Sequence, residues 1–188
     1  ALLARLDSVK PFSLLETSGE RAIVNYRDDR LNAVRPGDPA AIVAGADAVL
    51  ADNRFPDFVL PICEAARERG IPVVLDADEP RHDSNRLLNV VSHVVFSAEG
   101  LRATARVEDL GEGLRIVAKM TPAWLGVTDG TKGVVWLENG AVQRRDSFPV
   151  KTVDTLGAGD TFHGAFTLML AESISEREAI RFSAAAAA

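Results

Sequence analysis

The chain has 188 residues, of which 47% are hydrophobic and 26% are charged, and its formal net charge is −6. This length and composition suffice to bury one substantial core, and the acidic balance argues against a nucleic-acid-binding protein, which carries an excess of lysine and arginine. The single cysteine, Cys63, excludes an intramolecular disulfide framework and predicts a reducing compartment, the cytoplasm. No run of about 18 apolar residues occurs, so no membrane span is predicted.

Both ends of the chain are abrupt. It starts at Ala1 without Met, and Ser183 is followed by five alanines, as in a helix interrupted in mid-course. We therefore expect that parts of a longer protein are absent at both ends.

The first predicted element is a β-hairpin. Within Pro11–Tyr26, two runs rich in apolar and β-branched residues flank Thr17-Ser18-Gly19-Glu20, which has the composition of a turn. The polar run Arg27-Asp28-Asp29-Arg30 then ends the ribbon.

From Gly45 onward, short apolar runs alternate with helical patterns. In the helix predicted over 57–70, Phe58, Ile62, Ala65 and Ala66 have helical spacing. Such alternation predicts an α/β domain with a mostly parallel sheet. The expected strands are 48–52, 72–76, 93–97 and 123–128, and the further helices are 87–91 and 108–118.

Two more strands, 133–138 and 141–147, follow directly, and Asn139-Gly140 between them is a strong hairpin signal. A helix is then expected to run from the glycines near 157 to about Ala171, with one apolar face packed on the sheet. A last helix is expected to begin near Ser175, with Glu178 completing a capping box.

Polar clusters follow three of the predicted strands. They are Asp52-Asn53-Arg54, Asp76-Ala77-Asp78 and Ser97-Ala98-Glu99. Ligands of open α/β sheets bind beyond the carboxyl ends of the strands, so the site is predicted there. No catalytic role is assigned to Asp76, which is expected to cap its loop.

The segment Thr152–Phe166, TVDTLGAGDTFHGAF, carries the chemistry. Gly157-Ala158-Gly159 gives unobstructed backbone where a helix starts, and the first-turn N–H groups of a helix attract anions. Asp160 places a carboxylate beside this turn. Phosphoryl transfer needs such donors for the moving phosphoryl group and a base beside the attacking hydroxyl. Taken alone, the same residues also fit simple helix capping by Asp160.

The string DTLGAGDTFHGAF resembles the C-terminal signature of the PfkB, or ribokinase-like, carbohydrate kinase family. This resemblance implies a ribokinase-like three-layer α/β/α sandwich with a mostly parallel sheet and a small β-sheet lid. It also implies that Asp160 is the catalytic base and that the amides of Gly157, Ala158 and Gly159 form an anion hole. Every fixed position of the signature is met, by Asp154, Thr155, Gly157, Ala158, Gly159, Asp160, Phe162, Gly164 and Phe166.

The resemblance assigns two further residues of this segment. Asp154 is implied to lie near the phosphates and the metal, where some members of the family bind a monovalent cation, here taken as K⁺. His163 occupies a variable position of the signature and is expected to be a packed or solvent-edge residue of the helix.

Val127–Gly133, VTDGTKG, resembles the family's nucleotide loop, although by itself it also fits a plain hairpin turn. The resemblance implies that Thr128 and Gly130 face the phosphates of ATP and that Gly133 permits their close approach.

Metal and sugar contacts are implied at the strand ends. Phe96 replaces the Asn of the family's Asn-x-x-Glu motif, whereas Glu99 remains, as either an outer-shell Mg²⁺ contact or a helix-capping acid. The lack of this Asn resembles the ketohexokinase-like branch. Asn53 and Arg54 lie where the family contacts the sugar, and Arg54 pairs with an anionic substituent of the substrate or forms a surface salt bridge.

Residues 7–35 resemble part of the family's lid, which covers the sugar and often makes a dimer contact. We therefore expect a homodimer through the lid, with 36–188 and 1–6 as an incomplete kinase core. Ala1–Leu6 resembles a strand that normally lies well upstream, so a break in the chain after Leu6 is suspected.

These patterns predict transfer of the γ-phosphoryl group of MgATP to a hydroxyl of a ketose or related sugar, in the ketohexokinase/fructokinase-like branch. A nucleoside or sugar phosphate acceptor stays open, as does a catalytically silent sugar- or nucleotide-sensing protein, although the retained Asp160 argues against the latter. A dinucleotide-dependent oxidoreductase and a P-loop NTPase are disfavoured because neither G-x-G-x-x-G after the first strand nor G-x-x-x-x-G-K-[ST] is present.

Overall fold

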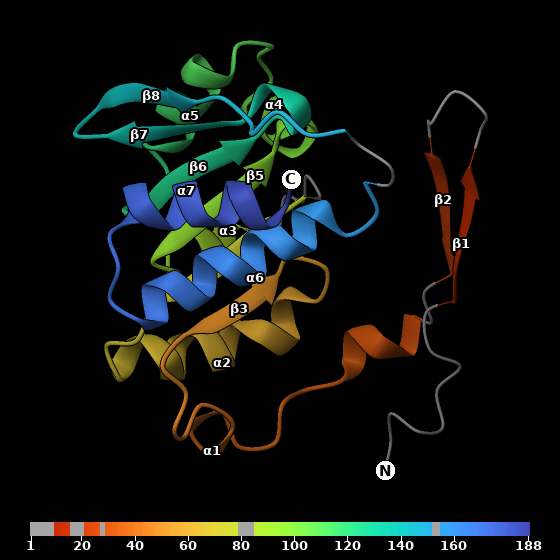
Figure 1. Ribbon diagram of the computed structural model, residues 1–188. Coiled ribbons are helices and arrows are strands. Elements are labelled where there is room, and N and C mark those ends of the chain that lie inside the picture. The colour runs from red at the N-terminus through yellow and green to blue at the C-terminus, as the bar shows by residue number, and fades with distance from the viewer. Residues whose placement is uncertain (1–9, 16–20, 27–28, 79–84, 152–154) are drawn as a thin grey trace. The chain divides into compact units, whose positions relative to one another are not determined.

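The computed structural model describes residues 10–15, 21–26, 29–78, 85–151 and 155–188, and the chain divides into two compact units, Ala1–Arg35 and Pro36–Ala188. In the first unit, β1 (Lys10–Leu15) and β2 (Arg21–Tyr26) pair antiparallel, which confirms the predicted ribbon (Figure 1). A short 3₁₀ helix, η2 (Asp29–Ala33), follows. The predicted turn over 17–20 and the suspected break after Leu6 lie outside the described residues.

The second unit is built on a six-stranded sheet with the order β3-β4-β5-β6-β7-β8. The first four strands run parallel to one another, and β7 and β8 are added antiparallel, so the predicted mostly parallel sheet is confirmed. The strands are β3 (Val49–Asp52), β4 (Val73–Ala77), β5 (His93–Ser97), β6 (Trp124–Thr128), β7 (Val134–Glu138) and β8 (Ala141–Arg145).

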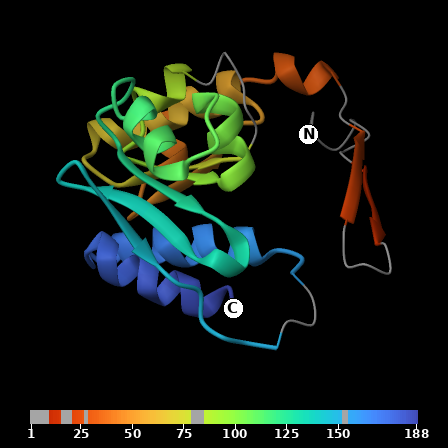
Figure 2. The same ribbon diagram turned by 90° about the horizontal axis from the view of Figure 1, so that it is seen from above.

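Helices cover both faces of this sheet, which makes three layers. Figure 2 shows α6 and α7 on one face and the helices α2 to α5 on the other. The helices are α1 (Pro39–Ile42), α2 (Pro56–Glu68), α3 (Asn85–Leu88), α4 (Ala98–Ala105), α5 (Leu110–Val117), α6 (Ala158–Ala171) and α7 (Glu176–Ala186), with a 3₁₀ turn η4 (Gly130–Lys132) after β6.

Each face of the sheet has its own hydrophobic core. Along β4, Val73 and Leu75 belong to the core beneath α2, α4 and α5, whereas Val74 belongs to the core beneath α6 and α7. This alternation follows from the two-residue period of a strand, and burial on both faces explains why the central strands are continuous apolar runs. In the second core, Phe166 of α6 stacks on Trp124 with ring centroids 5.2 Å apart.

The predicted Asn139-Gly140 hairpin is confirmed, because both residues have positive φ, as a type I′ turn requires. The helix α4 was not predicted. It begins directly after β5, where the Ser97 side chain caps it by accepting the Gly100 N–H at 3.0 Å. A connection without loop residues left no turn signal in the sequence.

The predicted helix over 57–70 is confirmed as α2, in which Ala66 is buried and Ile62 and Ala65 pack against the core. One finer prediction is wrong. At the start of α7, Ser175 is the N-cap residue but makes no side-chain capping bond, and the Glu178 carboxylate accepts instead from Arg181 Nε at 2.9 Å. The capping box is therefore not formed.

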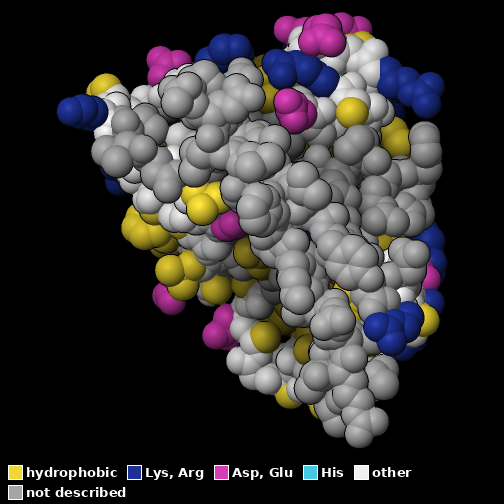
Figure 3. All heavy atoms as spheres, turned by 90° about the vertical axis from the view of Figure 1, so that its right-hand side faces the viewer, with side chains coloured by type: hydrophobic (Ala, Val, Ile, Leu, Met, Phe, Trp, Pro, Cys, Tyr) yellow, Lys and Arg dark blue, Asp and Glu magenta, His cyan; other side chains and the backbone are white. Residues whose placement is uncertain are grey.

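The described part of the surface is mixed in character. Figure 3 shows acidic, basic and hydrophobic side chains interspersed on the portion of that face whose residues are described. Among the described residues, no helix has the length and apolar character that a membrane span needs.

Candidate active site

The carboxyl ends of the parallel strands bring the predicted polar clusters together. Asp52 at the end of β3 lies opposite Asp76 on β4, which in turn lies opposite Val95 on β5. Ser97 at the end of β5 lies opposite Thr128 on β6. Because these strands are parallel and in register, residues from four separate segments share one edge of the sheet, as predicted.

The predicted anion-binding turn lies at the start of α6. Gly157 is the N-cap residue with φ 76° and ψ 5°, a left-handed conformation that favours glycine. The Ala158 N–H donates to the Thr155 carbonyl at 3.2 Å, and the Thr161 N–H donates to the Gly157 carbonyl at 2.8 Å. Between them, Gly159 and Asp160 carry the N–H groups that the first turn of a helix leaves without intrahelical acceptors. The amide of Ala158, predicted to bind an anion, is thus already engaged.

Asp160 is exposed and belongs to the first turn of α6. Its carboxylate lies near the N-cap, because a Cβ added to Gly157 would be 3.9 Å from Asp160 Oδ2. The positive end of the helix dipole attracts negative charge here. Asp160 is therefore an exposed carboxylate beside the first-turn N–H groups of α6. Asp154, predicted to contact a monovalent cation, lies outside the described residues.

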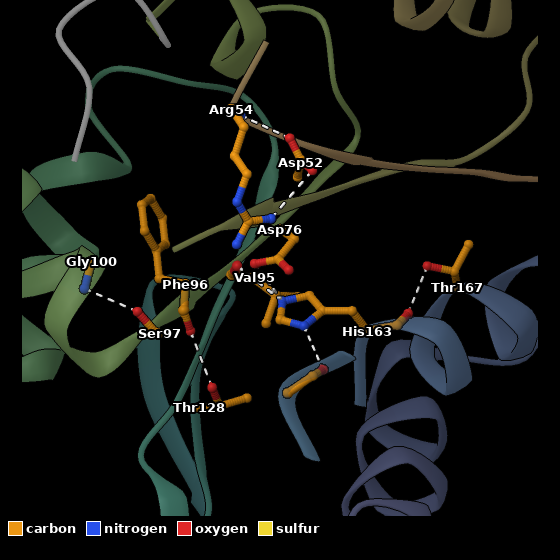
Figure 4. Close-up of polar contacts among 11 residues, drawn as sticks. Asp52, Arg54, Asp76, Val95, Phe96, Ser97, Gly100, Thr128, His163 and Thr167 are labelled. Carbon is orange, nitrogen blue, oxygen red and sulfur yellow. Dashed lines mark hydrogen bonds and ion pairs between the residues drawn. The ribbon is translucent and has the colours of Figure 1, made fainter. Parts of the chain in front are cut away.

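His163, one turn further along α6, is buried beneath this turn with 2% of its surface exposed. Its Nδ1 lies 2.7 Å from the Gly159 carbonyl oxygen, and its Nε2 lies 3.3 Å from the Val95 carbonyl oxygen and 3.5 Å from Asp76 Oδ1 (Figure 4). His163 is thus a packed residue, as expected, but its contact with Asp76 was not predicted. The four-residue spacing between Gly159 and His163 is the one sequence signal that could have pointed to the contact between these two residues.

Burial, helped by the nearby Asp78 carboxylate, raises the pKa of Asp76 from 3.8 to about 6, although His163 and Arg54 oppose this shift. The folded protein therefore binds this proton more tightly than the unfolded chain. The resulting stabilisation is fully present below pH 3.8 and is lost as the pH rises through about 6.

The predicted sugar-contact residues follow β3. The Arg54 guanidinium pairs with the Asp52 carboxylate, with Nη1 3.3 Å from Oδ2, and the Arg54 backbone N–H donates to Oδ1 at 2.8 Å. The salt bridge of Arg54 is thus present, and a contact of Arg54 with the substrate stays a prediction. Asn53 is buried, with 3% of its surface exposed.

The predicted nucleotide loop is the tight turn after β6. The Thr128 hydroxyl donates to the Phe96 carbonyl at 3.4 Å, and the Asp129 N–H donates to the Gly133 carbonyl at 2.8 Å. Gly133 has φ 89°, and a Cβ there would lie 2.0 Å from the Arg145 carbonyl oxygen. The close approach that requires this glycine is thus made by the protein's own backbone. Gly130, with φ 51°, has open space around it.

Glu99, predicted as an outer-shell metal contact or a capping acid, is exposed in the first turn of α4. Ser97 supplies the side-chain cap of that helix, and Glu99 adds an acid where the helix dipole favours one. Within the described part of the chain, no three His, Cys, Asp or Glu side chains are grouped to hold a metal ion.

The fold and sequence are similar to those of ribokinases. The chain is 29% identical to the ribokinase of Bacillus subtilis, over 97% of this chain and 65% of that protein. It superimposes with a TM-score of 0.90 on a crystal structure assigned as a ribokinase from Agrobacterium tumefaciens, at 34% identity over 96% of this chain and 60% of that one. For Arabidopsis thaliana ribokinase complexed with ribose and ATP, the TM-score is 0.76 at 28% identity, over 93% of this chain and 60% of that one.

The chain thus spans less than two thirds of the length of these relatives. Their names do not specifically support the ketohexokinase/fructokinase-like branch that the strand-end residues suggested. Residues 10–188 match the model of the pfkB family of carbohydrate kinases, and the chain belongs to this family.

Proposed function

We propose that the protein transfers the γ-phosphoryl group of ATP to a hydroxyl of a free sugar, with Asp160 as the base. The observation that carries this proposal is the start of α6. There an exposed carboxylate adjoins a helix turn whose Gly159 and Asp160 N–H groups have no intrahelical acceptors. Membership of the pfkB family supports the same chemistry.

In this mechanism, the sugar oxygen attacks the γ-phosphorus while the bond from phosphorus to the bridging oxygen of ATP breaks and ADP leaves. The proton of the attacking hydroxyl passes to the Asp160 carboxylate. The N–H groups of Gly159 and Asp160 stabilise the charge on the transferring group. Because the transition state of phosphoryl transfer is loose, orienting the hydroxyl matters more than a strong base.

Nucleotide contacts are proposed for the turn after β6, with Gly130 as its most open position. Mg²⁺ is usually held by substrate phosphates and one or two carboxylates, and it would neutralise charge on the phosphates. Glu99 is the exposed carboxylate that could contact its water shell. K⁺ near Asp154 and a homodimer through β1 and β2 stay predictions.

The charges at the strand ends favour a neutral acceptor. Arg54 is paired with Asp52, and Asp76 and Asp78 add two further carboxyl groups to this cluster. A phosphate substituent on the sugar would meet this acidic edge and be repelled. We therefore disfavour the sugar phosphate alternative. Ribose is the first acceptor to test because of the ribokinase relatives, and fructose tests the predicted ketose preference.

The test is ADP release by the purified protein with MgATP and ribose, fructose, a nucleoside or a sugar phosphate. Asp160→Ala and the isosteric Asp160→Asn are expected to lose turnover by about 1,000-fold or more with ATP binding retained, because both lack a base. Glu172→Gln, an exposed acid at the other end of α6, is the matched control and should retain activity.

Equal turnover by the wild-type protein and Asp160→Asn would refute Asp160 as the base. ATP binding by the wild-type protein without turnover of any acceptor would favour the sensing alternative.

A further inference from the structure

We propose that His163 is a positioning residue for phosphoryl transfer, because its Nδ1 holds the Gly159 carbonyl and thereby aims the anion-binding N–H of Asp160. The inference rests on the proposed kinase function and deepens it. It assigns to His163 a role that its place on the buried face of α6 does not require.

The argument starts from one peptide unit. The Gly159 carbonyl and the Asp160 N–H belong to the same planar trans peptide, so they point in opposite directions. In α6 the backbone N–H of His163 is already the helical donor to this carbonyl, and the 2.7 Å contact from His163 Nδ1 adds a second donor that holds the carbonyl, and with it the direction of the N–H. A donor at this carbonyl further polarises the peptide unit, which makes its N–H a better donor toward an anion.

The other edge of the ring also faces oxygen atoms. Nε2 faces two acceptors, the Val95 carbonyl at 3.3 Å and Asp76 Oδ1 at 3.5 Å. A neutral imidazole has only one N–H, yet oxygen atoms lie at both nitrogens. The much shorter contact is the one at Nδ1, and because a carbonyl oxygen can only accept, this contact places an N–H on Nδ1.

Nδ1 therefore donates to the Gly159 carbonyl. Asp76 Oδ1 is itself buried and has no hydrogen-bond partner among the described residues, and His163 Nε2 lies 3.5 Å from it. A carboxylate thus orients a histidine, and the histidine orients the backbone (Figure 4). The relay joins the ends of β4 and β5, near the proposed sugar contacts, to the anion-binding turn.

Two substitutions separate the two edges of the ring. In His163→Asn, the side-chain amide can replace Nδ1 and still donate to Gly159, but it cannot reach Asp76. In His163→Gln, the amide can replace Nε2 and still contact Val95 and Asp76, but not Gly159. If His163 only ties α6 to the sheet, the Gln variant should retain a higher kcat than the Asn variant. If His163 positions the turn at Gly159, the Asn variant should retain the higher kcat.

We expect His163→Gln and His163→Leu to lower kcat by about 100-fold, the scale of a donor misplaced by roughly 1 Å, with KM for the sugar changed by less than about 3-fold. His163→Asn is expected to recover kcat to within about 5-fold of the wild type, because the donor to Gly159 is retained. Circular dichroism confirms that each variant is folded.

A second readout does not depend on activity. In ¹H–¹⁵N spectra, the Asp160 amide signal is expected to stay close to its wild-type position in His163→Asn and to move in His163→Gln. The inference is overturned if Gln retains kcat better than Asn, or if the Asp160 signal moves equally in both variants. Absence of sugar phosphorylation by the wild-type protein, with the expected amide signals, refutes the proposed function but leaves the positioning of the turn supported.

Discussion

Replacing Gly133 by alanine should destabilise the protein far more than the same change at Gly130, although both glycines belong to the turn between β6 and β7. Gly133 has φ 89°, and its added Cβ would meet three backbone atoms, of Arg145 at 2.0 Å, Ser147 at 2.7 Å and Asp146 at 2.8 Å. Gly130 has φ 51° and no atom within 4 Å of its added Cβ.

The magnitude follows from this geometry. In the left-handed helical region positive φ costs an alanine about 1–2 kcal/mol, and Gly133, with φ 89° and ψ −138°, lies outside that region, where the cost is at least as large. At Gly133, the Cβ must also withdraw from 2.0 Å to at least 3.0 Å from the Arg145 carbonyl. That shift disturbs the 2.8 Å bond from the Asp129 N–H to the Gly133 carbonyl and the pairing of Val134 with Arg145. Two weakened hydrogen bonds add about 1 kcal/mol each. We therefore expect a loss of about 3–4 kcal/mol for Gly133→Ala and about 1–2 kcal/mol for Gly130→Ala.

Urea unfolding followed by circular dichroism measures both changes. The difference between the two variants measures what is particular to Gly133, namely its backbone conformation and its contact with the Arg145 carbonyl. Equal losses in the two variants, or a larger loss for Gly130→Ala, would refute the reasoning that Gly133 is required by the backbone of Arg145.

Three further predictions concern the cores and the buried acid. The difference in free energy of unfolding between Asp76→Asn and the wild type should rise by about 3 kcal/mol between pH 4 and 6 and then level off, because only the wild type loses a proton that favours folding. Urea titrations at several pH values measure this difference, and a difference independent of pH would contradict the prediction. Phe166→Ala, at a fully buried position, should cost about 3–5 kcal/mol in thermal unfolding, against under about 0.5 kcal/mol for the exposed Leu168→Ala on the same helix. Burial raises the pKa of Cys63 to about 12, so its thiol should react with a disulfide reagent only on unfolding, and rapid labelling of the folded protein would disprove its burial.

Much of the framework was predictable because it depends on neighbours in the chain. The alternation of apolar runs and helices indicated the layered fold, and Asn139-Gly140 indicated the β7–β8 turn. The glycines before Asp160 indicated a helix start with exposed N–H groups. The helix α4 escaped prediction because its cap, Ser97, is also the last residue of β5 and leaves no loop between the two elements.

The amino-acid sequence alone determined the parts of the site that depend on backbone conformation over a few residues, namely the glycine-rich start of α6, its adjacent carboxylate and the glycine-containing turn after β6. Only the tertiary structure decided which partners those parts acquire. Asp76 and His163 come from distant segments and meet because parallel β4 and β5 lie beneath α6. Likewise, the need for Gly133 is set by the carbonyl of Arg145 on β8. Such contacts depend on the packing of whole elements, and local residue patterns do not contain that distance information.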